Sequence, residues 1–376
     1  MKIKLGELAD IMTGNTPSMK VNEYYDSNDI PFIKPDSFKG HFELEANSFL
    51  SNKAERKARI VGANCILVSC IGIIGKVGIT SQKVAFNQQI NSLNVKSHYD
   101  IEYIAYNLLF NKDRLQRICN SAVVPLINKT QFSNFEISIN KDIIIQRDIK
   151  NKLNLLSSII NNNKKKLLLL DDIVKSRFVE LIYNNKLIYQ KVRLKDCCLI
   201  SSGATPSRKN SDYWDENGIN WFKTTELKNN FLFDSDEKIS KLGYEKTSVK
   251  ILPKHTVLIA MYGQGKTRGM TGYLLNNATT NQACAALISL DTINPKYLWY
   301  TMINSYDRLR NMAKGGTQPN LSVSLIKDFE IILPPIDIQN KFTNYIEQIN
   351  KLKADVQKSI DETQLLMDSL MQEYFG

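Results

Sequence analysis

Hydrophobic residues recur with a helical period in two long segments of the chain, residues 143–182 and 336–375. Many of them lie seven or fourteen positions apart, a spacing typical of helices that pair in a coiled coil. The predicted seam residues are Ile149, Leu156, Ile159, Leu170 and Ile173 in the central segment, and Phe342, Tyr345, Ile349, Leu352, Val356, Leu366 and Leu370 in the C-terminal one. We expect each helix to be about 57 Å long. The alternative is two ordinary amphipathic core helices.

Outside these segments, short apolar runs alternate with joints rich in glycine and asparagine. Runs such as 64–68 and 256–260 contain many β-branched residues and predict strands. The chain is therefore predicted to have an α/β fold of the mixed α+β type, with two globular domains in tandem and two long helices that pair antiparallel. The predicted order is first domain, central helix, second domain and C-terminal helix, at residues 1–142, 143–185, 186–335 and 336–376.

The two globular segments are copies of one another. Short motifs of the first half return in the second in the same order, at an offset that rises from 189 to 194 residues. Unrelated matches would not keep this order, so the pattern indicates an internal duplication. The repeated segments are Gly14–Ser18 and Gly203–Ser207, Tyr24–Asp26 and Tyr213–Asp215, Ile30–Lys34 and Ile219–Lys223, Asn87-Gln88 and Asn281-Gln282, Asp113–Leu115 and Asp307–Leu309, and Phe135–Ile137 and Phe329–Ile331.

The charge of the chain favours a polyanionic partner. Lys and Arg together number 49 against 38 acidic residues, which gives a net charge of +11. Nucleic acid is the simplest partner for such a chain. The central helical segment, residues 142–182, is net positive, and residues 336–376 are net negative. This opposite charge favours pairing of the two helices with each other.

The cysteines and histidines exclude several classes of protein. The six Cys and three His residues show no C-x-x-C motif and no ligand spacing, so we expect neither a zinc site nor a disulfide framework. The N-terminus lacks the apolar region of a signal peptide, and no apolar run is long enough for a membrane span. We therefore expect a cytoplasmic protein with no membrane partner.

Residues 260–267 loosely match the phosphate-binding loop of nucleotide-dependent enzymes. In a true P-loop, a helix begins after the lysine and directs its N-terminus at the phosphates. Here Gly269 and Gly272 occupy the positions where that helix should begin. We therefore expect a glycine-rich loop after a strand that presents basic residues to phosphates or guanine edges. The first half would present Lys76, and the second half Gln264, Lys266 and Arg268; a plain basic hairpin turn is the alternative for each.

The segment Leu333-Pro334-Pro335-Ile336 superficially resembles the Asp/Asn-Pro-Pro-aromatic motif of amino-methyltransferases. That chemistry needs a polar first residue to accept from the target amino group and an aromatic residue to stack on the flipped base. Leu333 and Ile336 can do neither. The two prolines are predicted instead to precede the C-terminal helix, with Asp337 near its positive end.

Together, the duplicated motifs and the Phe329–Gln339 segment that leads into the last helix resemble the DNA-specificity subunit of type I restriction–modification systems, over nearly the whole chain. The resemblance implies two target-recognition domains that bind a bipartite site in double-stranded DNA, and two helices in an antiparallel coiled coil. It implies two modification subunits and further restriction subunits as partners. It implies no catalytic residue, metal or cofactor in this chain, because S-adenosylmethionine, ATP and Mg²⁺ are used by the partners.

The predicted DNA-contacting residues lie in the repeated motifs and the glycine-rich loops. For the repeated Asn-Gln pairs, hydrogen bonds that support the sheet are favoured over base contacts. The candidates are Lys34, Lys76, Asn87 and Gln88 in the first half, and Lys223, Gln264, Lys266, Arg268, Asn281 and Gln282 in the second. Two other functions remain open: a double DNA-recognition regulator outside restriction, and a nucleotide-dependent enzyme that uses residues 260–267.

Overall fold

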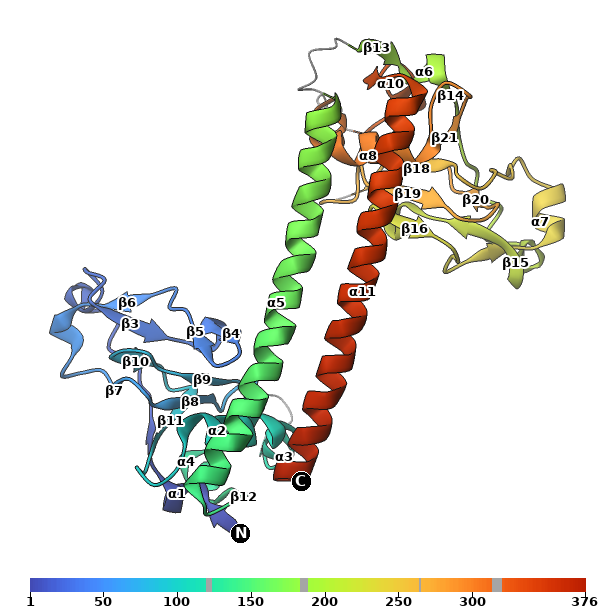
Figure 1. Cartoon of the computed structure of the whole chain (residues 1–376). Helices are drawn as coiled ribbons and strands as arrows, with labels where there is room; N and C mark the ends of the chain where they lie inside the picture. The colour runs from blue at the N-terminus through green and yellow to red at the C-terminus, as the bar shows by residue number, and fades with distance from the viewer. Residues whose placement is uncertain (120–123, 183–188, 264, 313–319) are drawn as a thin grey trace. The chain divides into compact units, whose positions relative to one another are not determined.

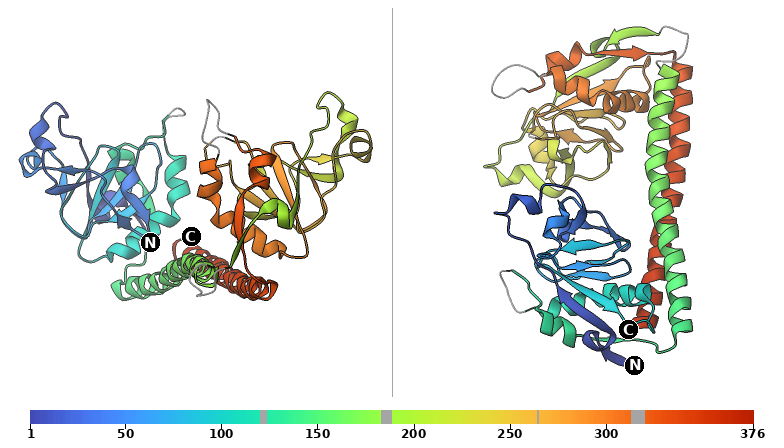
Figure 2. Two further views of the ribbon diagram at one scale, coloured as in Figure 1. Left: turned by 90° about the horizontal axis from the view of Figure 1, so that it is seen from above. Right: turned by 90° about the vertical axis from the view of Figure 1, so that its left-hand side faces the viewer.

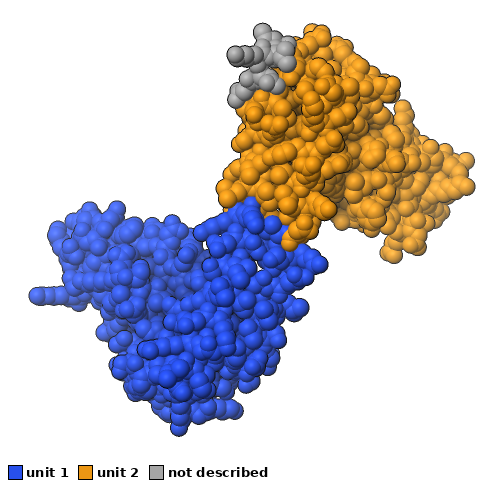
Figure 3. All heavy atoms as spheres, viewed as in Figure 1, with its two compact units in different colours: residues 1–166, 356–376 blue, residues 167–355 orange. Residues whose placement is uncertain are grey.

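The computed structural model describes residues 1–119, 124–182, 189–263, 265–312 and 320–376. The chain forms two compact units, one of residues 1–166 with 356–376 and one of residues 167–355 (Figure 3). Each long helix therefore contributes one part to each unit. Among the described residues, no helix combines the length and the apolar character needed to cross a bilayer.

The first unit contains two four-stranded sheets beside a small group of helices (Figure 1). Strands β6-β3-β10-β7 form one sheet, and β2-β11-β8-β9 form the other. The strands are β1 Lys2–Lys4, β2 Ala9–Thr13, β3 Ile30–Ile33, β4 Phe38–Gly40, β5 Glu43–Leu44, β6 Phe49–Leu50, β7 Ile60–Val61, β8 Ile66–Ser69, β9 Val77–Ile79, β10 Val84–Phe86, β11 Ile90–Val95 and β12 Glu136–Ser138. The helices are α1 Leu5–Leu8, α2 Ile101–Phe110, α3 Lys112–Arg117, α4 Lys129–Asn134 and α5 Ile143–Ile182.

The second unit repeats this plan. Its sheet β14-β21-β18-β19 has the order of β2-β11-β8-β9 and adds β16, and its β15 pairs parallel with β20 as β3 does with β10. The strands are β13 Gln190–Arg193, β14 Cys198–Ser202, β15 Trp214–Phe222, β16 Asn230–Leu232, β17 Lys238–Ile239, β18 Val257–Ala260, β19 Thr271–Leu274, β20 Thr279–Thr280, β21 Cys284–Ser289 and β22 Glu330–Leu333. The helices are α6 Leu194–Cys197, α7 Lys241–Glu245, α8 Pro295–Asn304, α9 Tyr306–Met312, α10 Val323–Lys327 and α11 Ile336–Phe375. The duplication inferred from the sequence is thus confirmed.

Helices α5 and α11 are 40 residues each, so the structure contains the two long helices that the apolar spacing predicts. They lie side by side (Figures 1 and 2). In the first unit Asn163 Nδ2 donates to Ser359 Oγ at 3.1 Å, while Ile149 shares a core with Phe375. In the second unit Asp171 pairs with Lys353, and the rings of Phe178 and Phe342 lie 5.2 Å apart. As the residue number of the contacting position rises along α5, that of its partner falls along α11. The helices therefore pair antiparallel within each unit.

Part of the predicted seam is wrong. Ile159, Ile173, Leu352 and Leu366 are 36 to 50% exposed. Each half-helix also packs against its globular domain, so the buried stripe must serve two partners and departs from a strict heptad. The positions that are buried instead include Leu153, Ile160, Val174, Phe178, Ile346, Ile360, Met371 and Phe375.

The two long helices begin at equivalent positions of the repeats, but different residues precede them. Helix α11 begins directly after Pro334-Pro335, as predicted from the fixed backbone of proline. Helix α5 begins after Asp142, whose carboxylate accepts a hydrogen bond from the Ile144 backbone N–H at 2.8 Å. An acceptor for the free N–H groups of the first turn thus replaces the prolines in the first repeat.

A buried glutamine joins each long helix to its globular domain. Gln146 and Gln339 are fully buried. Gln146 accepts from the Asp100 N–H at 2.8 Å and donates to the Asn140 carbonyl at 2.7 Å. Gln339 accepts from the Asn294 N–H at 2.8 Å and donates to the carbonyls of Pro334 at 2.8 Å and Thr292 at 3.1 Å. Asp100 and Asn294 are the N-caps of α2 and α8, so the same connection is made twice.

We predict that Gln339→Ala lowers the free energy of unfolding by about 2–3 kcal/mol, because three backbone groups lose the partner that the buried amide provides. The melting temperature should fall by roughly 4–8 °C, measured by differential scanning calorimetry. Gln348→Ala, at an exposed position of the same helix, is the control and should change stability by less than about 0.5 kcal/mol. Equal melting temperatures for the two variants would show that the buried amide does not stabilise the junction.

Candidate nucleic-acid interface

Parallel strand pairing brings two of the predicted motifs to one edge of the first unit. Strands β3 and β10 pair in parallel, with Phe86 opposite Ile33. Lys34 follows β3 and Asn87-Gln88 follows β10, so both motifs lie at the carboxyl ends of the strands. The Asn87 N–H donates to the Ile33 carbonyl at 3.1 Å and fixes this arrangement. Sequence reasoning identified these residues but gave no reason for their proximity.

The second unit has the same edge. Strands β15 and β20 pair in parallel, with Phe222 opposite Thr280. Lys223 and Asn281-Gln282 follow these strands, and the Asn281 N–H donates to the Phe222 carbonyl at 3.1 Å. The structure therefore brings together the repeated Lys and Asn-Gln motifs in both units.

The Gly-x-Thr-Pro segment packs directly on this edge. A Cβ atom on Gly14 would lie 2.3 Å from the carbonyl oxygens of Phe86 and Asn87, and one on Gly203 would lie 1.9 Å from that of Thr280. Only glycine permits so close an approach of two backbones. The adjacent threonines then reach the repeated glutamines: Thr16 Oγ1 donates to Gln88 Oε1 at 2.7 Å, and Thr205 donates to Gln282.

The asparagines of the Asn-Gln pairs also bond internally. The side-chain oxygens of Asn87 and Asn281 each accept from a backbone N–H two residues further on, at 3.1 Å. Such turns are typical of asparagine and order the chain after a strand. These contacts favour the interpretation that the Asn-Gln pairs support the fold of the edge.

The glycine-rich loops lie beside the same motifs. At the start of the loop between β8 and β9, the Cys70 N–H donates to the Gln89 carbonyl at 2.7 Å. At the start of the loop between β18 and β19, the Met261 N–H donates to the Ala283 carbonyl at 2.8 Å. In the first unit Lys76 Nζ donates to the Pro35 carbonyl at 2.8 Å, next to Lys34. Four separate segments of the sequence therefore converge at this edge of the first domain.

The strand register shows which residues of the two loops are equivalent. Gly75 N–H bonds to the carbonyl at the end of β8, and Gly269 N–H bonds to the carbonyl at the end of β18. Both glycines have positive φ, +83° and +88°. The counterpart of Lys76 is therefore Met270, and Lys266 belongs to an extension found in the second loop alone. The chain enters strand β19 after this loop, so the residues described here provide no helix N-terminus that could face phosphates.

Helix α9 holds the second loop in place. Tyr306 Oη donates to the Lys266 carbonyl at 2.7 Å, and Arg310 donates to the Arg268 carbonyl at 3.0 Å. The Lys266 side chain is exposed, and Arg268 is half-buried. Gln264, the remaining candidate of this loop, lies outside the described residues.

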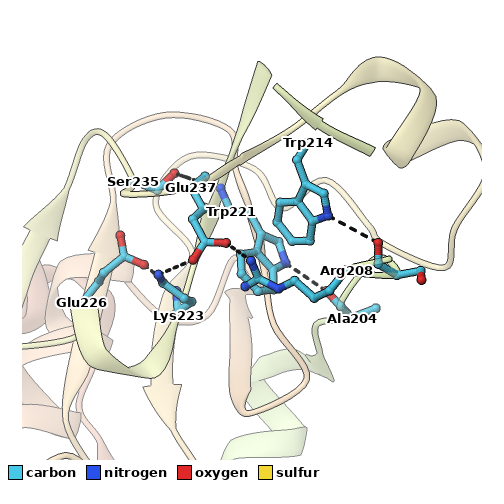
Figure 4. A network of polar contacts seen from close by, with 9 residues as sticks. Ala204, Arg208, Trp214, Trp221, Lys223, Glu226, Ser235 and Glu237 are labelled. Atoms are coloured by element: carbon cyan, nitrogen blue, oxygen red, sulfur yellow. Dashed lines mark hydrogen bonds and ion pairs between the residues drawn. The ribbon is translucent and has the colours of Figure 1, made fainter. Parts of the chain in front are cut away.

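The charge of Lys223 is compensated within the protein (Figure 4). Its ammonium pairs with one carboxylate oxygen of Glu237, and Arg208 pairs with the other. The hydrogen bond to Glu237 raises the pKa of Lys223, and that from Arg208 lowers the pKa of Glu237. The Arg208 guanidinium lies 4.3 Å from the ring centre of Trp214 and 5.2 Å from that of Trp221. Lys223 and Arg208 are therefore held in an internal network.

Lys34, the counterpart of Lys223, has a different environment. Its ammonium lies 5.3 Å from the ring centre of Phe32. Within the described part of the chain, no carboxylate approaches the Lys34 ammonium within the 4.0 Å of an ion pair. The sequence did not reveal this difference, because Glu237 reaches Lys223 through the pairing of β15 with β17. The two edges thus share a backbone and differ in charge.

Sequence reasoning also missed a run of exposed basic residues near the first edge, Arg56, Lys57 and Arg59. The available signal was the density of positive charge in the segment 53–59. It was overlooked because the second repeat has no matching motif.

Comparison with known proteins identifies the family. The sequence profile of the type I restriction modification DNA specificity domain matches residues 1–170 and again residues 188–363. The MjaIX specificity subunit of a type I restriction enzyme from Methanocaldococcus jannaschii is 22% identical over 98% of this chain and 90% of that protein. The HindI specificity subunit from Haemophilus influenzae is 32% identical over 35% of this chain and 30% of that protein.

Solved structures share the fold. The S subunit of a type I restriction–modification system from M. genitalium superposes with a TM-score of 0.60 at 14% identity, over 100% of this chain and 96% of that one. A chain from a study of complex assembly and conformational transition of the type I system superposes with a TM-score of 0.68 at 13% identity, over 100% of this chain and 97% of that one. The chain accordingly belongs to the family of type I restriction–modification DNA specificity domains and carries that domain twice.

Proposed function

We propose that this chain is the DNA-specificity subunit of a type I restriction–modification complex and reads a bipartite site with one domain per half-site. The recognition domains would be residues 1–142 and 186–335, and the helices 143–185 and 336–376 would connect them. The observation that carries this proposal is the duplicated edge, where the repeated motifs converge twice on the same strand ends.

The edge has the chemistry that duplex DNA requires. Lysine and arginine neutralise phosphates and position a protein on the duplex, whereas contacts with base edges specify the sequence. The first edge would use Lys34 and Lys76, and the second Lys266 and Arg268. Lys223 is paired with Glu237 and would chiefly support the second edge. This difference between the domains fits two half-sites of different sequence.

We infer that catalysis belongs to partner subunits, which would bind S-adenosylmethionine, ATP and Mg²⁺. Leu333-Pro334-Pro335-Ile336 serves as the junction between β22 and α11. The loop at residues 261–270 leads into a strand, unlike a P-loop. Burial raises the pKa of the Cys70 and Cys284 thiols to about 12, which leaves these two residues protonated and poor nucleophiles at neutral pH.

The long helices offer surface for partner subunits. Leu155 is 63% exposed and Leu365 is 72% exposed in the first unit, and Leu168 is 67% and Leu169 is 62% exposed in the second. Contiguous exposed apolar surface is typical of protein interfaces. Their presence in both units supports binding of two modification subunits, one per unit, to which restriction subunits would add.

We predict that the purified chain alone neither transfers methyl groups nor hydrolyses ATP, and that its cognate modification subunit restores site-specific methylation. Methylation of plasmid DNA, mapped by sequencing, is the measurement. Methyl transfer by the chain alone would contradict the non-catalytic role. Tight DNA binding without methylation in the presence of the modification subunit would favour the alternative of a regulator.

We predict that Lys76→Ala and Lys266→Ala each weaken binding to a mixed-sequence duplex. Each should lower the slope of log affinity against log salt by about 0.9, the value for one lost phosphate contact. Fluorescence anisotropy over a range of KCl concentrations measures both quantities. Lys254→Ala is the control, because Lys254 is exposed beyond the opposite end of β20. Unchanged affinity and slope in both test variants would exclude the two loops from the interface.

We predict that the paired helices set the distance between the half-sites. Four residues inserted into both helices, after Lys166 and after Asp355, preserve the antiparallel pairing and add about 6 Å. Since DNA rises about 3.4 Å per base pair, the spacer of the methylated site should grow by about one or two base pairs. Both half-site sequences should stay the same. An unchanged spacer in the methylation map would show that the helices do not measure this distance.

A further inference from the structure

The side chain of Asn15 holds a separate segment of the first unit by two hydrogen bonds. Asn15 occupies the variable position of the repeated Gly-x-Thr-Pro motif. Its Nδ2 donates to the Lys57 carbonyl at 2.7 Å, and its Oδ1 accepts from the Arg59 N–H at 2.6 Å. The Asn15 amide therefore bonds to the Lys57 carbonyl and the Arg59 N–H as a neighbouring strand would. These two bonds fix the backbone path of residues 57–59.

The fixed segment concentrates positive charge. Arg56, Lys57 and Arg59 are all exposed. None of the three forms an ion pair with a carboxylate of any residue that the structure describes, whereas the neighbouring Lys53 pairs with Glu23 and Asp26, and Lys83 with Glu55. Three uncompensated cations thus lie within four residues. A surface of this kind binds phosphates well, because the cations repel one another until an anion neutralises them.

The segment lies at the edge already described. Strand β7 runs antiparallel to β10, with Ile60 opposite Ala85. Arg59, the residue before Ile60, is therefore beside the end of β10, where Asn87-Gln88 begins. Thr16, the neighbour of Asn15, contacts Gln88 directly. The basic segment thus continues the surface of Lys34 and Gln88.

We propose that Arg56, Lys57 and Arg59 contact the phosphate backbone of DNA at the first half-site, with Asn15 as the residue that positions them. This inference rests on the proposed function. The basic segment continues the edge that we propose to bind DNA, so DNA is favoured over an acidic protein surface as its partner. The second repeat does not have this positioning side chain, because Ala204 occupies the place of Asn15. The Ala204 carbonyl accepts instead from Trp221 Nε1 at 2.9 Å.

The first test removes charge from the segment of the full chain. The Arg56→Ala/Arg59→Ala variant and a Lys2→Ala/Lys4→Ala control each lose two exposed cations of the same unit. Anisotropy titrations with a fluorescent mixed-sequence duplex of about 40 base pairs, at about 50–200 mM KCl, give affinity and salt slope. The arginine variant should lose about tenfold or more in affinity and lower the slope by about 1.8, the value for two phosphates, while the control stays close to the wild type.

The second test moves the segment without changing its charge. Asn15→Ala places in the first repeat the residue that the second repeat has naturally, so the fold should tolerate it. We expect severalfold weaker binding to the same duplex at an unchanged melting temperature. Asn15→Ala that binds like the wild type would remove the positioning role.

The outcomes separate this inference from the proposed function. A wild-type chain that binds the duplex without salt dependence would overturn the proposed function itself. If the wild type binds and the arginine variant binds equally well, or loses no more than the lysine control, the proposed phosphate contact is wrong. An arginine variant that keeps DNA affinity but no longer associates with the modification subunit would assign the segment to a protein interface instead.

Discussion

One buried amide at the start of each long helix joins that helix to its globular domain. Gln146 and Gln339 connect the first turn of α5 and α11 to the N-cap of the domain helix beside it. Because these amides are fully buried, any displacement of the helix start would leave backbone groups without partners. The domain therefore has a defined position on its helix, which the proposed binding of a half-site requires. The interaction occurs in both repeats, although the residues before the two glutamines differ.

The repeats combine one scaffold with two different surfaces. Parallel strand pairs, a close glycine contact and a Thr–Gln hydrogen bond recur in both units and have structural roles. On this common edge the charges differ: Lys34 has no acidic partner among the described residues, while Lys223 shares Glu237 with Arg208. The proposed reading of two unlike half-sites needs this combination, because the shared backbone preserves the geometry while side chains change the contacts.

The sequence predicted the features that depend on local pattern. The helix bounds follow from apolar periodicity and from Pro334-Pro335, and the duplication follows from motifs that keep their order. Features that depend on packing between distant segments were not predicted. Ile173 and Leu352 fit the heptad but are exposed, since each half-helix packs on a domain as well as on its partner. The pairing of Lys223 with Glu237 and the equivalence of Lys76 with Met270 both follow from strand register, which the repeat motifs alone could not give.

The most direct test of the account is methylation mapping of a chain with two copies of one recognition domain. Residues 186–335 would replace residues 1–142, with both helices intact, and the variant would be expressed with the modification subunit. Since the helices pair antiparallel, the account predicts methylation of a palindromic site, the second half-site followed by its inverted copy. Methylation of the original asymmetric site, or of sites unrelated to the second half-site, would contradict the claim that each domain reads one half-site independently.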